Sequence, residues 1–125
     1  MNEIAATELQ ILGCFGVEPR LRDSEVPWCY NDAAYLTEID GLWVSFAIAP
    51  AYHDVRILVA RGNQRLFEFN SMGVMDVRVI DEPGVDAVEV VLSKQAWLKL
   101  QLRPLFEITQ GFAVDTAIHC SERRS

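Results

Sequence analysis

Half of the 125 residues are hydrophobic, 23% are charged, and the excess of acidic over basic residues gives a formal net charge of −7. This balance is typical of a folded globular domain and excludes a disordered chain. The negative charge argues against nucleic acid and anionic membrane surfaces, because both require basic patches, and favours a basic partner. We therefore predict one domain over residues 1–125, in which 113–125 form a loosely ordered tail.

The cysteines and the start of the sequence predict a cytoplasmic protein. Cys14, Cys29 and Cys120 are odd in number and form no Cys-x-x-Cys pair, which favours reduced thiols over a disulfide framework. The sequence begins without the basic segment of a secretory signal, and its longest apolar run, 42–51, contains Pro50. That run is much shorter than a membrane-spanning helix requires.

The first 33 residues carry two conflicting patterns. Residues 3–12 have apolar side chains at helical spacing, whereas 9–17 alternate equally well as a strand. We predict a short helix over 3–12 followed by extended chain, with the strand as the alternative. Residues 18–33 contain two prolines and several charges, so we predict an irregular connection.

Asp40-Gly41 is the strongest hairpin signal in the sequence, because Asp-Gly suits a type I′ turn between alternating strands. We predict strands near 34–39 and 42–49, the second ended by Pro50. The turn sets three cross-strand pairs, which are Ile39–Leu42, Thr37–Val44 and Tyr35–Phe46.

A further hairpin follows, and here the turn and the apolar pattern disagree. A two-residue Gly62-Asn63 loop places Ile57 opposite Glu68, whereas a three-residue loop sets two apolar pairs, Val59–Phe67 and Ile57–Phe69. We predict the three-residue loop, because the burial of two phenylalanines outweighs a turn preference. It also sets Arg61 opposite Arg65.

The segment from Met75 to Leu102 predicts three adjacent strands, reversed at Pro83-Gly84 and at residues 93–95. Side chains alternate between the two faces of a strand, so this register gathers apolar residues on one face and charges on the other. A slip of one residue would bury the charges, so both patterns select the same register. The apolar pairs are Met75–Leu92, Val77–Val90, Val79–Val88, Val90–Leu98 and Val88–Leu100, and the charged row is Arg78–Glu89–Lys99.

The apolar alternation continues beyond Leu102, but one strand from 96 to 109 would span about 46 Å, too long for a domain of this size. We predict a bend at Pro104, where the chain turns a corner between sheet layers, and then a strand near 105–110 that Gly111 ends. The whole sequence predicts a mainly β fold. It is an antiparallel meander of about eight short strands, forming a barrel or a sandwich.

Tyr52-His53-Asp54 is the one stretch that sets an imidazole beside an acid and a phenol. Adjacent residues on a strand point to opposite faces, so we interpret His53 as a surface histidine at the start of a strand. No serine or cysteine can be tied to it as a nucleophile. His119-Cys120 and the remaining cysteines have no metal-ligand spacing. We predict neither a metal nor a cofactor.

Three functions are compatible with these features, and protein binding fits them best. The first is a non-enzymatic binding or regulatory module, of immunity or inhibitor type, that contacts its partner protein through Trp97, Val91, Trp28 and Tyr30. The second is a carrier of a small apolar ligand in a barrel cavity lined by Phe46, Ile57, Phe67, Val90 and Leu100. The third is an enzyme that uses His53 with Asp54 or Tyr52. Self-association through Trp97 or an exposed strand edge is a further expectation.

Overall fold

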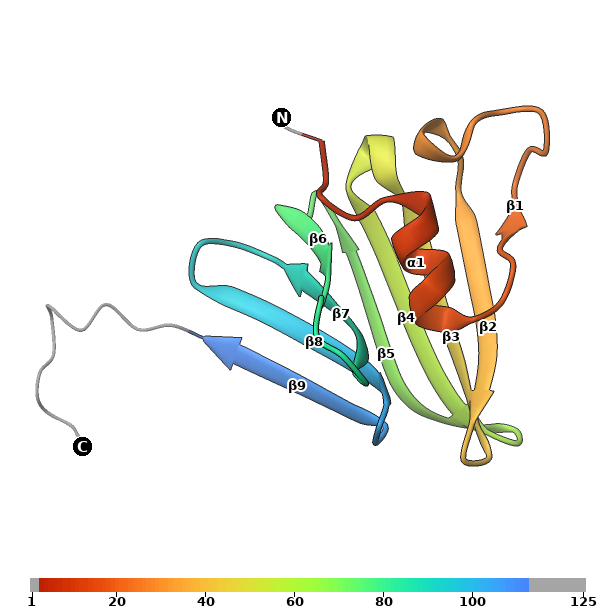
Figure 1. Cartoon of the computed structure of the whole chain (residues 1–125), viewed down its shortest axis with the longest axis vertical. Coiled ribbons are helices and arrows are strands. Elements are labelled where there is room, and N and C mark those ends of the chain that lie inside the picture. The colour runs from red at the N-terminus through yellow and green to blue at the C-terminus, as the bar shows by residue number, and fades with distance from the viewer. Residues whose placement is uncertain (1–2, 113–125) are drawn as a thin grey trace, which may run out of the picture.

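The computed structural model describes residues 3–112, so the predicted tail and His119-Cys120 lie outside the described residues. Residues 3–112 form one short α-helix and nine strands in two antiparallel sheets (Figure 1). The large sheet is ordered β1 (Arg20–Leu21), β2 (Ala33–Ile39), β3 (Leu42–Ala49), β4 (Asp54–Arg61) and β5 (Gln64–Met72). The small sheet is ordered β6 (Asp76–Val79), β7 (Asp86–Val91), β8 (Ala96–Arg103) and β9 (Glu107–Phe112). The predicted mainly β antiparallel meander is confirmed, and its two sheets form a sandwich-like arrangement and no closed barrel.

The predicted Asp40-Gly41 hairpin joins β2 to β3. Both turn residues have positive φ, 51° and 80°, as a type I′ turn requires. All three predicted pairs form, namely Ile39–Leu42, Thr37–Val44 and Tyr35–Phe46. A 3-10 helix, η2 (Pro50–Tyr52), begins at the proline that was expected to end the second strand.

The β4–β5 hairpin combines the two features that the sequence set against each other. Gly62-Asn63 forms a two-residue turn flanked by the Arg61–Gln64 pair, yet Val59 still lies opposite Phe67. A β-bulge beside Val59 absorbs the difference, because one extra residue on β5 shifts the register without altering the turn. The prediction of the apolar pairs is confirmed, whereas the three-residue loop and the Arg61–Arg65 pair were wrong.

The three central strands pair in the predicted register, with Val77–Val90, Val79–Val88, Val90–Leu98 and Val88–Leu100. The charged row forms on the other face. Arg78 Nη1 lies 3.8 Å from Glu89 Oε1, and Lys99 lies opposite Glu89 on the neighbouring strand. Met75 departs from the prediction, because it precedes β6 and is 48% exposed. Its N–H bonds the Val91 carbonyl oxygen, one residue away from the expected partner.

The chain reverses after Arg103, and β9 pairs with β8 in the same sheet. Pro104 therefore lies at a break between strands, as predicted, but the chain does not turn a corner between layers there. The prediction that Gly111 ends the last strand was also wrong. Trp97 lies opposite Gly111, and a Cβ at this position would be 2.0 Å from the indole ring, so glycine lets the ring lie across β9.

A helix forms near the N-terminus, but α1 covers Glu8–Phe15 rather than residues 3–12. The Thr7 hydroxyl accepts a hydrogen bond from the Gln10 N–H, and the Gln10 side chain accepts one from the Thr7 N–H. This capping box fixes the first turn, and Gly16, with φ of 71°, ends the helix. The strand alternative for 9–17 was therefore wrong. Within 18–33, β1 and the 3-10 helix η1 (Trp28–Tyr30) interrupt the irregular chain, and β2 begins at Ala33.

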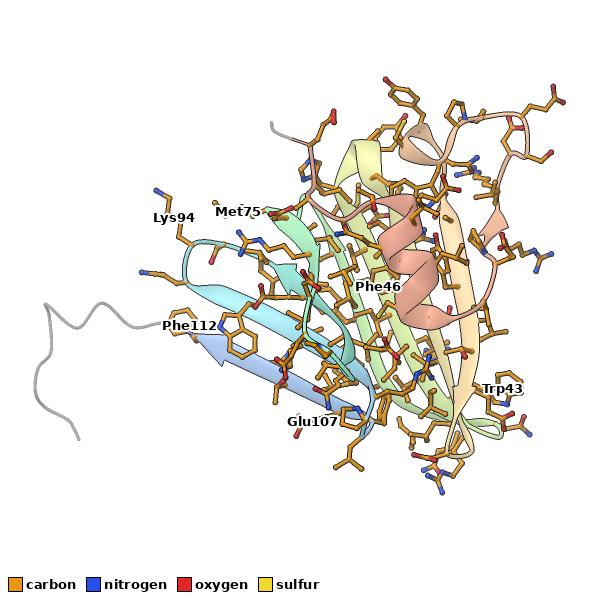
Figure 2. The ribbon with its side chains drawn as sticks, in the orientation of Figure 1. Trp43, Phe46, Met75, Lys94, Glu107 and Phe112 are labelled. Atoms are coloured by element: carbon orange, nitrogen blue, oxygen red, sulfur yellow. The ribbon has the colours of Figure 1, made fainter. Side chains whose placement is uncertain are left out.

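Helix α1 crosses the inner face of the large sheet and also contacts β6 and β7 of the small sheet (Figure 1). Phe15 stacks on Tyr35 and Phe46, with ring centroids 5.6 and 5.1 Å apart, and Figure 2 shows Phe46 beneath the helix. The inner valines and leucines of the small sheet belong to the same buried cluster. The helix thus fills the space between the two sheets.

Candidate functional site

His53 is buried, so the interpretation as a surface histidine was wrong. It is 4% exposed and follows η2 in a left-handed backbone conformation. Its Nδ1 lies 2.7 Å from the Val74 carbonyl oxygen, and its own carbonyl accepts a 2.9 Å bond from the Val74 N–H. A carbonyl oxygen only accepts, so Nδ1 carries the hydrogen and Nε2 of the neutral ring is an acceptor. These bonds span 21 positions of sequence, which no local pattern reveals.

The structure does not bring Tyr52 and Asp54 to His53. Tyr52 is 73% exposed, and Asp54 forms an ion pair with Arg56, with Nε and Oδ2 3.3 Å apart. Among residues 3–112, His53 forms no side-chain bond to either neighbour. The stretch therefore supplies one buried imidazole rather than an acid–base unit.

A hollow of about 450 Å³ lies where the N-terminal segment, η1 and η2 meet. We call it the N-terminal hollow, and its lining residues are Glu3, Ile4, Ala6, Thr7, Glu8, Trp28, Cys29, Tyr30, Pro50, Ala51 and His53. It contains two of the four predicted contact residues, Trp28 and Tyr30. It also contains His53, the candidate catalytic residue, whereas the N-terminal segment that forms another wall was not marked as functional.

Asp76 holds the N-terminal segment beside β6. Its Oδ1 accepts bonds from the N–H groups of Ala5 (2.7 Å) and Val77 (2.8 Å), and its Oδ2 accepts one from Arg78 Nε (3.0 Å). The Ala6 N–H also donates to the Val77 carbonyl oxygen. Burial alone would raise the pKa of Asp76, but these three hydrogen bonds and the Arg78 charge outweigh it, so the pKa lies below its usual value.

Trp28 is fixed by the core beneath it. Its Nε1–H donates a 2.9 Å hydrogen bond to the hydroxyl of Tyr35, which is fully buried and stacks on Phe15. Burial raises the pKa of Tyr35, the Trp28 hydrogen bond opposes the rise, and the Glu8 and Glu18 carboxylates add to it. The indole N–H is therefore satisfied inside the protein, and Glu8 brings negative charge to this end of the helix.

A second hollow, of about 760 Å³, covers the outer face of the small sheet near the β7–β8 loop. We call it the Trp97 hollow; it is lined by Glu3, Gly73, Val74, Met75, Asp76, Arg78, Glu89, Val91, Leu92, Ser93, Lys94, Ala96 and Trp97. Val91 and Trp97 pair across the strands and are half-buried. Figure 2 shows Met75 and Lys94 at this end of the sheet. Glu3 lines both hollows, so the two adjoin at this residue.

The outer face of the large sheet carries an apolar patch that the sequence analysis missed. Leu36 is 57% and Trp43 45% exposed, and the pairing Leu36–Ser45–Leu58 places Leu58 on the same face. Figure 2 shows Trp43 near the β2–β3 hairpin. The predicted hairpin register already turned these residues outward, so their apolar character was the available signal.

The residues predicted to line a carrier cavity lie elsewhere. Phe46, Ile57, Val90 and Leu100 are buried in the central cluster, and Phe67 packs against it. None of these five lines the N-terminal hollow or the Trp97 hollow. The stacked ring of Phe15 fills the position that a ligand would need above Phe46.

Residues 3–112 contain no group of three or more histidine, cysteine or acidic side chains placed to hold a metal ion. Over the same residues, no helix has the length and apolar character needed to cross a membrane.

The fold and these hollows describe an antiparallel β protein with a concave, partly aromatic surface. No protein-family model and no curated protein sequence matches the chain. Its fold is similar to that of a chain in the contact-dependent growth inhibition toxin–immunity protein complex from Klebsiella pneumoniae 342. The TM-score is 0.69 at 18% identity, and the match covers 87% of this chain and 96% of that chain.

Proposed function

We propose that this chain is an immunity-type protein that binds a growth-inhibiting toxin protein in the cytoplasm and blocks it by surface contact. The observation that carries the proposal is the likeness in fold to a chain of a toxin–immunity protein complex over most of both chains. A function by contact needs a complementary surface, and the two adjoining hollows supply one.

The charge distribution supports a basic partner. Four of the 11 lysines and arginines form ion pairs with carboxylates, namely Arg56, Arg65, Arg78 and Arg103. The formal net charge is −7, which leaves an acidic protein. Electrostatic attraction of this kind accelerates association with a positively charged surface and disfavours acidic competitors.

The surface formed by the two adjoining hollows contains all four predicted contact residues. Trp97 and Val91 line one hollow, and Trp28 and Tyr30 line the other. Buried aromatic anchors surrounded by polar residues are the usual source of binding energy in protein interfaces. We place the toxin contact on this surface rather than on the apolar patch around Trp43.

The proposal is tested by expressing the reading frames that flank this chain's gene, each with and without the full chain. We expect one flanking frame to arrest growth, co-expression of the chain to restore it, and the two proteins to elute as one complex. Growth arrest that the chain does not relieve, or flanking frames of which none is toxic, would overturn the proposal. Light scattering of the chain alone distinguishes this complex from self-association.

Two tryptophan variants locate the contact. Trp97→Ala should weaken toxin binding by tenfold or more, about the effect of losing an aromatic anchor, whereas Trp43→Ala should leave it unchanged. Both side chains lie on outer sheet faces, so Trp43 is the matched control. Titration calorimetry measures the affinity and circular dichroism checks the fold. A loss confined to Trp43→Ala would place the contact on the large sheet instead.

A further inference from the structure

The N-terminal hollow differs from the other concave surfaces of the chain in its charge. Glu3 and Glu8 line it, and no lysine or arginine of residues 3–112 does. The Trp97 hollow includes Arg78 and Lys94. A third hollow, of about 530 Å³ beside β2 and β4, includes Arg22 together with Asp23, Asp32 and Asp54. Arg78 forms ion pairs with Asp76 and Glu89, and Arg56 forms ion pairs with Asp32 and Asp54. Within residues 3–112, by contrast, neither Glu3 nor Glu8 of the N-terminal hollow forms an ion pair.

A buried imidazole provides a second, independent indication of a ligand. His53 is 4% exposed and lines this hollow, and its Nδ1 is bound to the Val74 carbonyl oxygen. Its Nε2 has no hydrogen-bond partner within residues 3–112. Because this nitrogen is not fully buried, it can accept a hydrogen bond from an N–H donor that enters the hollow.

The aromatic walls of the hollow suit a flat cation. The Trp28 N–H is already bonded to the Tyr35 hydroxyl, which holds the indole in place, and Tyr30 is 69% exposed beside it. A guanidinium group stacks on aromatic rings and donates paired hydrogen bonds to carboxylates. An ammonium group is not planar, so it cannot both stack on the rings and bind a carboxylate through paired hydrogen bonds.

The helix N-terminus opposes a cation, but by less than the carboxylates attract it. Helix α1 begins at Glu8, and its first turn carries the equivalent of about half a positive charge. The two glutamates carry two full negative charges. The net potential at the hollow is negative, so the helix does not exclude a cationic ligand.

We propose that the N-terminal hollow receives an arginine side chain of the partner protein. Glu3 and Glu8 bind its guanidinium group, Trp28 and Tyr30 flank it, and His53 Nε2 accepts one of its N–H groups. The hollow, at about 450 Å³, falls within the range of about 300–1,000 Å³ typical of ligand pockets. This inference rests on the proposed function, because it names the chemistry by which the toxin is recognised.

The test uses a small arginine derivative in place of the partner protein, so it does not require the toxin. Nα-acetyl-arginine amide is titrated into the full chain, and the indole N–H signal of Trp28, identified by its loss in Trp28→Phe, is followed by NMR. We expect a saturable shift and binding of the neutral isostere Nα-acetyl-citrulline amide that is at least about tenfold weaker. Glu8→Gln and Tyr30→Ala should each weaken arginine binding by about tenfold as well.

Glu38→Gln is the matched control, because this exposed glutamate lies at the hairpin end of β2 and lines none of the three hollows. No saturable shift, equal binding of citrulline, or no effect of either hollow variant would overturn the inference. A protective toxin complex that Glu8→Gln and Tyr30→Ala leave intact would remove the arginine contact and keep the immunity function. An arginine-selective shift in a chain that protects no cells would keep the cation site and overturn the toxin as its source.

Discussion

The two ends of helix α1 border opposite kinds of environment. At its C-terminal end, Cys14 and Phe15 are buried against the two sheets, and the aromatic stack excludes solvent. At its N-terminal end, Thr7 and Glu8 line an acidic hollow open to a partner. One eight-residue helix therefore completes the core with its last turn and builds a candidate binding surface with its first. Changes at the first end should alter stability, and changes at the second should alter binding.

The largest effect should come from removing the aromatic ring at the buried end. Phe15→Ala deletes a ring that stacks on Tyr35 and Phe46, and we expect a loss of about 3–5 kcal/mol in the free energy of unfolding. Urea denaturation followed by circular dichroism measures it. Leu9→Ala on the same helix is the control, because Leu9 is 78% exposed, and its effect should stay within about 0.5 kcal/mol. Equal losses in the two variants would contradict a helix with one buried end.

A smaller effect should follow from releasing the N-terminal segment. Asp76→Asn keeps an acceptor for the Ala5 N–H but loses the charged bond to Arg78, so we expect a loss of about 1 kcal/mol in stability. The pKa of Asp76 is lowered in the folded state, so its stabilisation is complete above the ordinary value of 3.8 and is lost as pH falls through the lowered value. The difference between wild type and variant should therefore be constant near neutral pH and shrink in acid.

Asp81→Asn provides the comparison for this pH series, because Asp81 is exposed and forms no hydrogen bond or ion pair within the described chain. Its stability should match that of wild type across the range. Amide hydrogen exchange supplies a local readout, and Asp76→Asn should accelerate exchange at Ala5 and Ala6, whose N–H groups bond to β6. Unchanged exchange at these two amides would show that Asp76 does not hold the segment.

The small sheet could be predicted from sequence because two patterns fixed its register independently. A slip of one residue in the pairing would expose the inner valines and leucines. It would also bury the outer row of Arg78, Glu89 and Lys99. The β4–β5 hairpin shows the limit of this reasoning. Turn preference and apolar pairing were treated as exclusive, whereas the bulge beside Val59 satisfies both, and single-residue insertions leave no trace in the alternation.

The candidate site was less predictable because it depends on contacts between distant segments. Trp28 and Tyr30 stood out as aromatic residues in a loop, but the Asp76–Ala5 bond spans 71 positions and the His53–Val74 bond spans 21. Neither follows from periodicity. Glu8 is an ordinary first-turn acid of a capped helix, and only the fold brings it beside Trp28 in one hollow.

The smallest perturbation is a comparison of thiol reactivity between the buried end of α1 and the N-terminal hollow, which leaves the fold intact. Cys14 is 3% exposed, and burial, reinforced by the Asp86 carboxylate and partly opposed by Arg103, raises the pKa of its thiol to about 12. Cys29 is exposed and lines the N-terminal hollow. Because the thiolate is the reactive form, iodoacetamide at pH 8 should modify Cys29 at least about a hundredfold faster than Cys14, as measured by peptide mass mapping.

Urea should abolish this difference, because unfolding exposes both thiols to the same solvent. Bound toxin should slow the modification of Cys29 and leave Cys14 unchanged, since only the first lies on the proposed contact surface. Equal rates for the two cysteines in the native chain would mean that the last turn of α1 is open to solvent. The helix would then not divide a closed core from an accessible hollow.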